Sequence, residues 1–127
     1  GELLARIGAT LVTGGGGGVM EAASRGCRQA GGVTVGVLPS YELDDANPYC
    51  SIVIPTGIGF GRNVVTALSC DLVVAIGGDA ATLSEICYAW MHGRPIFMLQ
   101  GHGGWSDRVG DERLDDRDSS TMIRCSD

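Results

Sequence analysis

Three short glycine-rich turns constrain this chain more than any other feature. They occupy residues 13–18, 56–61 and 77–82, and we call them the first, second and third glycine loops. Each follows a short apolar run and opens a segment with helical character. If the apolar runs are parallel strands of one sheet, the loops share the edge beyond the carboxyl ends, where open α/β sheets bind ligands. Amide groups at helix starts favour anions, so the pattern predicts a phosphate-bearing small ligand.

The bulk composition indicates one globular domain. The chain has 127 residues, of which 44% are hydrophobic and 19% charged, enough apolar material for a sizeable core. The longest apolar run, residues 72–76, has only the length of a strand, so we expect no membrane span. A net charge of −6 with scattered arginines disfavours nucleic-acid binding. We expect a single domain over residues 1–127, as a fragment that lacks a first strand and a last helix.

The residue types that are absent or scarce exclude several kinds of chemistry. The chain has no lysine, so Schiff bases, pyridoxal phosphate attachment and a Walker-type lysine are excluded. The two histidines have no spacing typical of metal ligands, so we predict no metal site. The five cysteines form no Cys-x-x-Cys pair, and no signal peptide precedes them, which favours free thiols and a cytoplasmic location. These cysteines are Cys27, Cys50, Cys70, Cys87 and Cys125.

Apolar, β-branched runs alternate with helical segments along most of the chain. The predicted strands are residues 9–12, 33–38, 51–54, 72–76, 96–99 and, as a closing edge strand, 121–125. A helix is predicted after each of the three glycine loops, and the third helix covers residues 82–92. This order predicts an α/β fold, a Rossmann-like, doubly wound parallel sheet with helices on both faces. Residues 101–120 are polar and are expected to form a loop or lid.

The predicted anion site has Gly14 to Gly18 and Gly77-Gly78 as its cradle and Arg62 as its clamp. A run of five glycines costs conformational entropy, and a ligand pressing close to the backbone explains it better than a simple turn. Arg62 follows the second glycine loop, where its guanidinium could grip a phosphate, or else pair with a surface acid. Asn63 could bond a sugar or base. The predicted ligand-binding residues are Gly14, Gly15, Gly16, Gly17, Gly18, Gly57, Arg62, Asn63, Gly77, Gly78 and Thr82.

Glu85 has two readings from the pattern around it. Thr82-x-x-Glu85 fits a capping box, in which the glutamate bonds back to the helix start and has no role in catalysis. The same carboxylate, at the mouth of a glycine loop, could orient a water or stabilise a developing positive charge. Asp79 also lies in this loop, and its charge would repel phosphate. The sequence leaves both roles of Glu85 open.

Taken together, the three loops resemble the Rossmann-like superfamily that includes the LONELY GUY proteins. The segments that carry the resemblance are residues 13–22, 57–63 and 76–85. LONELY GUY proteins are phosphoribohydrolases of cytokinin riboside monophosphates, often mislabelled lysine decarboxylases. A lysine-free chain does not support pyridoxal-type catalysis. Within the superfamily the resemblance is closest to the branch of molybdenum cofactor carrier proteins and uncharacterised bacterial relatives, which implies ligand binding.

The third loop departs from the phosphoribohydrolase signature of that superfamily, P-G-G-x-G-T-x-x-E. Thr82 and Glu85 match, and Arg62 falls where the catalytic arginine is expected. Gly77, Asp79 and Ala81 replace the proline and two of the glycines. A methyl group and a carboxylate would narrow and charge the cradle, which argues against hydrolysis and leaves binding plausible.

The leading hypothesis is therefore a cytoplasmic binding protein for a nucleotide or another phosphate-bearing ligand such as the molybdenum cofactor. The resemblance also implies a homodimer or higher homo-oligomer. A first alternative is hydrolysis of the N-glycosidic bond of nucleoside 5′-monophosphates, with Arg62 and Glu85 as catalytic residues. A second alternative is an incomplete domain that serves only in oligomerisation.

Overall fold

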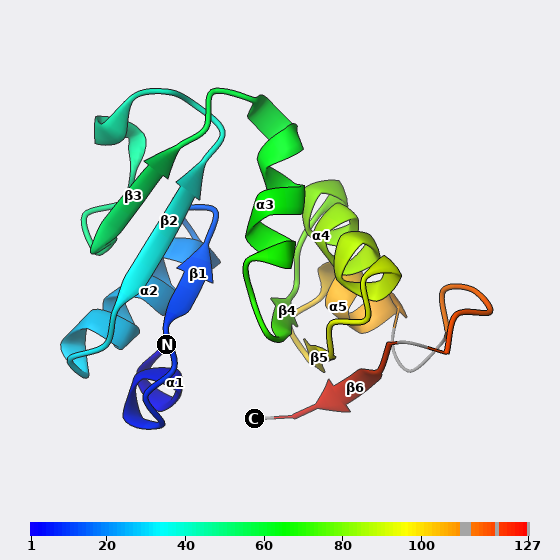
Figure 1. Ribbon diagram of the computed structural model, residues 1–127. Coiled ribbons are helices and arrows are strands. Elements are labelled where there is room, and N and C mark those ends of the chain that lie inside the picture. Colours follow the sequence, from blue (N-terminus) through cyan, green and yellow to red (C-terminus); the bar gives the residue numbers. More distant parts are fainter. Residues whose placement is uncertain (110–112, 119, 127) are drawn as a thin grey trace. The chain divides into compact units, whose positions relative to one another are not determined.

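The chain forms two compact units, each with its own parallel sheet. The computed structural model describes residues 1–109, 113–118 and 120–126. The first unit is Gly1–Arg62 and the second is Asn63–Asp127. Each contains a three-stranded sheet with helices joining the strands (Figure 1).

In the first unit, the strands follow the order β1-β2-β3 and are all parallel. Val35 at the centre of β2 pairs with Val12 on one side and with Ile52 on the other. The loops that follow these strands therefore lie at one carboxyl edge of this sheet. The elements are α1 (Glu2–Arg6), β1 (Leu11–Thr13), α2 (Val19–Gln29), β2 (Thr34–Leu38), η1 (Leu43–Asp45), β3 (Ile52–Pro55) and η2 (Gly59–Gly61).

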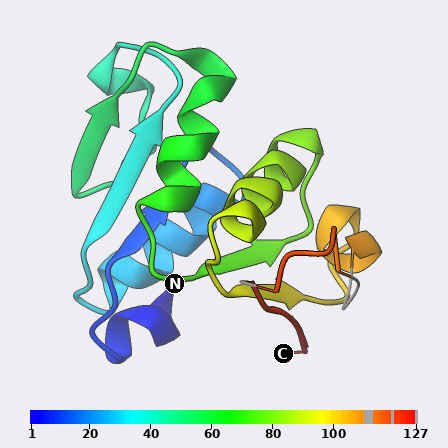
Figure 2. The same cartoon turned by 45° about the vertical axis from the view of Figure 1, so that its right-hand side comes forward.

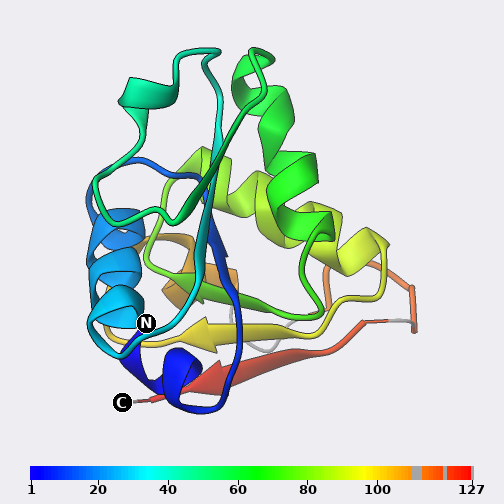
Figure 3. The same cartoon turned by 60° about the vertical axis from the view of Figure 1, so that its left-hand side comes forward.

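The core of the first unit forms around β2 because this strand has a neighbour on both sides. Val37 and Leu38 are almost fully buried, and so is Cys27 on the inner face of α2. Helix α1 packs along α2 and helps to cover it (Figure 3). The first glycine loop connects β1 to α2 in this unit.

In the second unit, the strands follow the order β4-β5-β6, again all parallel. Helix α4 runs along β4 and β5 (Figure 2). The elements are α3 (Arg62–Leu68, whose first residue closes the first unit), β4 (Val73–Ile76), α4 (Ala80–Met91), β5 (Ile96–Leu99), α5 (Gly104–Val109) and β6 (Met122–Cys125). One buried cluster joins β4, α4, β5 and α5, formed by Ala75, Ile86, Ala89, Trp90, Ile96, Met98 and Val109.

The parallel sheets and alternating helices confirm the predicted α/β, Rossmann-like fold and the closing edge strand β6. Two local predictions were wrong. Helix α4 begins at Ala80 rather than Thr82. Within the polar range 101–120, which was expected to be a loop, residues 104–109 form α5, because Trp105 and Val109 pack on the apolar cluster. Residues 110–112 and 119 of that range lie outside the described residues.

Candidate functional site

The first glycine loop is held in place through its carbonyl groups. The Asn47 side chain donates from Nδ2 to the carbonyl of Gly16 at 2.9 Å, and its backbone amide donates to the carbonyl of Gly15 at 2.8 Å. Asn47 is itself buried, and its Oδ1 accepts the amide of Tyr49 at 3.0 Å. The Gly15 amide donates to Oγ1 of Thr13 at 3.1 Å. These bonds fix the backbone of the loop.

The loop packs so closely on β2 that one loop position, Gly15, and one strand position, Gly36, require glycine. A Cβ atom on Gly15 would lie 2.7 Å from Cδ2 of Leu38, and Gly15 also has φ of +73°. A Cβ on Gly36 in β2 would lie 3.0 Å from Cα of Gly15. Part of the glycine content therefore serves packing, but this accounts for Gly15 and not for the residues after it.

The amide groups of Gly16, Gly17 and Gly18 lead into the start of α2. Gly18 is the N-cap, and no side chain caps this helix. In the part of the chain that the structure describes, no hydrogen bond is recorded for these three amides. Glu21 lies in the first turn of α2, with Oε2 3.9 Å from the Cβ position of Gly17. The helix start offers donors and a partial positive charge to an anion, against one nearby carboxylate.

The Arg62 side chain returns to this same loop from the end of the first unit. A Cβ atom on Gly14 would lie 2.5 Å from both Nη1 and Nη2 of Arg62 and 2.6 Å from its Cζ. The guanidinium therefore lies directly against the Gly14 backbone, and Gly14 is fully buried in the loop. The structure places Arg62 beside the first glycine loop, and its predicted contact with a ligand remains a prediction.

The second glycine loop ties the ends of β2 and β3 together. The amides of Gly57 and Gly59 donate to the carbonyls of Ser40 and Pro39, each at 2.9 Å. Oγ1 of Thr56 donates to the carbonyl of Leu38 at 2.6 Å. The Gly57 amide is thus engaged within the protein, so this glycine supports the chain path to Arg62. Its predicted contact with a ligand remains a prediction.

The third glycine loop is filled by contacts with α5. The Gly77 amide donates to Oγ of Ser106 at 2.7 Å. The Gly77 carbonyl accepts the Ser106 amide at 3.0 Å, and the Gly78 carbonyl accepts the Trp105 amide at 3.1 Å. A Cβ atom on Gly104 would overlap the backbone of Gly77 and Gly78, so the close approach of α5 to this loop requires glycine at position 104. These loop groups are therefore used by the fold itself.

Asp79, and not Thr82, caps α4. Asp79 is the N-cap residue, and its Oδ1 accepts the amide of Ala81 at 2.9 Å. Thr82 lies inside the first turn, with its side chain against the Cα of Gly78. The capping-box reading of Glu85 is therefore wrong, because Glu85 lies in the second turn of the helix, too far from its start. The catalytic role of Glu85 remains a prediction.

Asn63, predicted to contact the ligand, lies in a buried helix contact of the second unit. Only 2% of the residue is exposed, and Nδ2 donates to Oγ of Ser84 at 2.9 Å. Oγ of Ser84 in turn donates to the carbonyl of Ala81 at 2.6 Å. This chain of bonds joins α3 to the start of α4. The geometry indicates a positioning role for Asn63, and its predicted ligand contact remains a prediction.

Glu85 also influences the Cys70 thiol. Burial raises the pKa of Cys70, and the negative charges of Asp71 and Glu85 raise it further, against a smaller opposite effect of Arg94. Burial likewise raises the pKa of Cys50, partly offset by a hydrogen bond with Ser24. Both thiols are thus kept in their neutral form, which disfavours a nucleophilic role for either.

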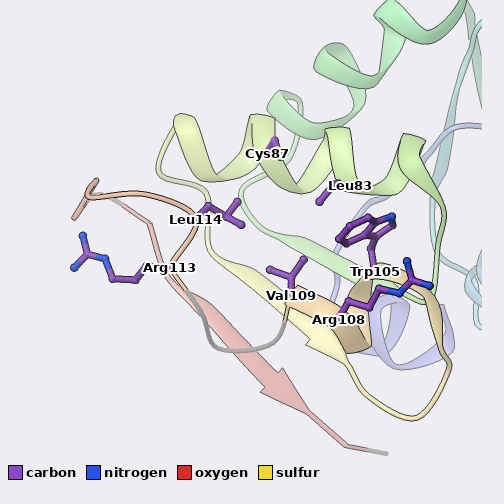
Figure 4. A pocket seen from close by; sticks show the side chains of 7 residues that line it. All are labelled: Leu83, Cys87, Trp105, Arg108, Val109, Arg113 and Leu114. Carbon is purple, nitrogen blue, oxygen red and sulfur yellow. The ribbon is translucent and has the colours of Figure 1, made fainter.

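A shallow pocket of about 510 Å³ opens in the second unit between α4, α5 and residues 113–114 (Figure 4). Leu83, Cys87, Val109 and Leu114 line it together with Trp105, Arg108 and Arg113. The Arg108 guanidinium lies 5.3 Å from the centre of the Trp105 ring. Arg113 pairs with Asp118 at 2.8 Å. None of the predicted site residues lines this pocket.

Two residues important for the loops escaped the sequence analysis. Asn47 lies in a polar stretch without periodicity, where Asn-Pro gave only a turn signal. Ser106 lies in the range that was predicted to be a loop. Both act across more than 28 residues of chain, at separations of 31 and 29 residues, and no local pattern records such a contact.

Two further features concern the described residues as a whole. None of their helices is both long enough and apolar enough to cross a bilayer. No group of three or more His, Cys, Asp or Glu side chains gathers among them as a metal ion would need.

These features define a Rossmann-like α/β protein whose glycine loops follow parallel strands at the edges where such folds bind ligands. The chain belongs to the SLOG cluster4 family, whose model matches residues 1–126. This membership, together with the structural neighbours, confirms the resemblance to the LONELY GUY-like superfamily and to its carrier-protein branch.

Several known proteins are similar to the chain. An uncharacterized protein of Archaeoglobus fulgidus is 40% identical over 100 residues, which are 79% of this chain and 66% of that protein. The X-ray structure of TM1055 matches with a TM-score of 0.91 and 40% identity, over 97% of this chain and 75% of that one.

Two of the similar solved structures are of proteins named for the molybdenum cofactor. The molybdenum cofactor binding protein of Rippkaea orientalis matches with a TM-score of 0.75 and 41% identity. The molybdenum cofactor carrier protein of Chlamydomonas reinhardtii matches with a TM-score of 0.70 and 36% identity. Each match covers 77% of this chain and 61% of the other. The chain thus spans less than two thirds of these proteins and of the archaeal relative.

Proposed function

We propose that this protein binds a phosphate-bearing small ligand at the first glycine loop. The amides of Gly16, Gly17 and Gly18 and the guanidinium of Arg62 would hold the phosphate oxygens. The positive end of α2 adds to this attraction, because its first amides have no capping side chain. In this proposal the third glycine loop shapes the second unit and contributes less to the phosphate contact than the sequence predicted.

The observation that carries the proposal is the contact between Arg62 and Gly14. A guanidinium laid against a glycine backbone, beside amides at a helix start, provides several donors on one side of the loop. The site lies within the first unit, so the proposal depends on no other part of the chain.

Two ligand classes that share a phosphate group fit the proposal, one suggested by the relatives and the other by the fold. The descriptions of the Rippkaea and Chlamydomonas proteins name the molybdenum cofactor. Nucleotides are the other class, because Rossmann-like glycine loops commonly bind their phosphates. A homo-oligomer in the cytoplasm remains part of the proposal.

Isothermal titration calorimetry tests the site with AMP, ribose 5-phosphate and inorganic pyrophosphate as probes. Arg62→Gln removes a charge-assisted contact and is expected to weaken binding by roughly 10- to 100-fold. Gly14→Ala keeps that charge but places a methyl group where the guanidinium lies, so it should weaken binding as well. Undiminished binding by both variants would show that the phosphate is held elsewhere.

A matched control uses an arginine of the same unit outside the site. Arg6 pairs with Glu2 on the exposed face of α1, so Arg6→Gln removes the same charge at a distance from the loop. Its binding constants should match those of the unchanged protein. Equal losses in Arg6→Gln and Arg62→Gln would indicate only a general effect of net charge.

The phosphoribohydrolase alternative requires Glu85 to act on the same ligand. Chromatography of free base released from nucleoside 5′-monophosphates tests it, with Glu85→Gln in parallel. A positioned general base contributes roughly 10²–10⁴ in rate, so release by the native protein that the variant loses would establish hydrolysis. No release with retained binding would leave a carrier or sensor. If no phosphate compound binds, the oligomerisation-only alternative gains support.

A further inference from the structure

The pocket of the second unit combines apolar walls from two helices with a positive charge at its side (Figure 4). We call it the α4–α5 pocket. On α4, Leu83 and Cys87 are four residues apart and share one face of the helix. On α5, Trp105 has Arg108 and Val109 three and four residues further on, so these side chains also share a face. All five residues line the same cavity of about 510 Å³.

The apolar walls of the pocket are only partly covered by the protein. Leu83 and Trp105 pack on the buried cluster of the second unit and also line the pocket. Leu114 lines it as well and is 37% exposed. Transfer of such apolar surface out of water contributes about 25 cal/mol per Å². The pocket therefore favours a ligand with an apolar body.

The charge at the pocket comes mainly from Arg108, whose guanidinium lies over the Trp105 ring, 5.3 Å from its centre. Stacking of this kind uses the flat face of a guanidinium and leaves its N–H edge to an oxygen ligand. Arg113, the second cation of the lining, is paired with Asp118 at 2.8 Å. No ion pair of Arg108 is recorded within residues 1–109, 113–118 and 120–126.

The backbone donors at the start of α5 are already used within the second unit. The amides of Trp105 and Ser106 donate to the carbonyls of Gly78 and Gly77. A phosphate dianion is best held by several donors, whereas a carboxylate matches a single guanidinium through two parallel N–H···O bonds. One guanidinium beside apolar walls thus fits a ligand with a single negative charge.

We propose that the α4–α5 pocket binds a small monocarboxylate with an apolar body. The carboxylate pairs with Arg108, and the body lies against Leu83, Trp105 and Leu114. This inference goes beyond the proposed function, because none of the residues proposed to hold the phosphate lines the pocket. Either proposal can therefore fail while the other stands.

NMR titration tests the inference with three probes that share a phenyl ring and a two-carbon chain. They are phenylacetate, 2-phenylethanol and 2-phenylethylammonium, and they differ in the charge of the head group. Phenylacetate is expected to bind most tightly and to shift the indole N–H signal of Trp105. Arg108→Gln should weaken phenylacetate by roughly 3- to 10-fold and leave 2-phenylethanol unchanged. Arg124→Gln, on the exposed surface of β6, is the matched control because it removes the same charge outside the pocket.

A second variant tests the apolar contact. Leu114→Ala should weaken phenylacetate and 2-phenylethanol alike, by roughly 2- to 10-fold, because it removes part of one wall. Leu114 is partly exposed, so the variant should fold, and unchanged amide signals in the first unit check this.

Four results would overturn the inference. They are the absence of any shift of the Trp105 signals, equal affinity for the three probes, and equal losses in Arg108→Gln and Arg124→Gln. The fourth is an equally strong response to inorganic phosphate, which would mean that the apolar body is not recognised. Shifts of the same signals with protein concentration alone would assign the pocket to a second copy of the chain and overturn the inference as well.

Discussion

The first and third glycine loops look alike in the sequence but use their backbone groups in opposite ways. In the first loop, Asn47 holds the carbonyl groups of Gly15 and Gly16, and the following amides have no recorded bond among the described residues. In the third loop, Ser106 and Trp105 bond the amide of Gly77 and the carbonyls of Gly77 and Gly78. The comparison teaches that two similar glycine runs can differ in whether their backbone amides are hydrogen-bonded within the protein or left available to a ligand.

The helices that follow the two loops also differ in whether a side chain caps their first amides. Helix α2 begins at Gly18 without a side-chain cap, whereas α4 begins at Asp79, whose carboxylate accepts the Ala81 amide. A carboxylate already fills the anion-binding position at α4. The electrostatic difference favours the first loop for a phosphate and assigns the third loop to the stability of the second unit.

The largest expected effect comes from filling the contact between α5 and the third loop. In Gly104→Ala, the new Cβ would lie 2.5 Å from the carbonyl carbon of Gly77, at a residue with φ of +64°. Strain and overlap together should lower the free energy of unfolding by about 2–5 kcal/mol in urea titrations. Gly101→Ala is the control, because its φ is also positive but no atom lies within 4 Å. A similar loss in both variants would mean that strain alone, not packing, explains Gly104.

The next largest effect is expected for the hydroxyl that satisfies the Gly77 amide. Ser106 is fully buried, and Ser106→Ala would leave a buried amide without its acceptor and the Leu99 carbonyl without a donor. We expect a loss of about 1–3 kcal/mol in the free energy of unfolding. Ser69→Ala removes an exposed hydroxyl that bonds within α3 and should change stability by less than about 0.5 kcal/mol. A stable Ser106→Ala would contradict the packing role of the third loop.

A smaller effect on stability, but a clear one on binding, is expected for Asn47→Ala. The substitution removes the Nδ2 bond to Gly16 and the Tyr49 bond, at a cost of about 1–2 kcal/mol in thermal unfolding. Because the Gly16 carbonyl is then no longer held, whereas the backbone bond to Gly15 remains, phosphate affinity should fall by roughly 10-fold in calorimetry, in contrast to Ser106→Ala. If the two variants lower affinity equally, the division of roles between the loops is wrong.

The smallest effect is expected for a substitution at the N-cap of α4. This variant tests most directly whether the first or the third loop binds the phosphate. Asp79→Asn removes the negative charge and keeps an efficient N-cap, so stability should change little. If phosphate binds at the first loop, its affinity should change by less than about 2-fold. An affinity gain well above this would place the phosphate at the third loop instead.

Much of the fold could be predicted from the sequence, because local signals carried it. The β-branched runs at 33–38 and 51–54 became β2 and β3, and the end of α4 falls before Gly93 as expected. The start of α4 could not be located in this way, because Asp79 and Thr82 are both competent caps. Only the observed bond from Ala81 to Asp79 distinguishes them. The helix α5 was missed because its stability comes from Trp105 and Val109 packing on the apolar cluster.

The candidate site was partly predictable for the same reason. The five glycines and Arg62 stand out by composition and position, and the structure brings Arg62 onto Gly14. The role of Asn63 could not be read from the sequence, since its partner Ser84 lies 21 residues away.

The sequence by itself determined the alternation of strands and helices, the family, and the places where the backbone could approach a ligand. These follow from side-chain periodicity and glycine, which act over a few residues. Tertiary structure alone decided which glycine loop has amides without a bond among the described residues and which one is bonded into the core. That choice depends on Asn47 and Ser106, whose hydrogen bonds form only after distant segments of each unit have packed together.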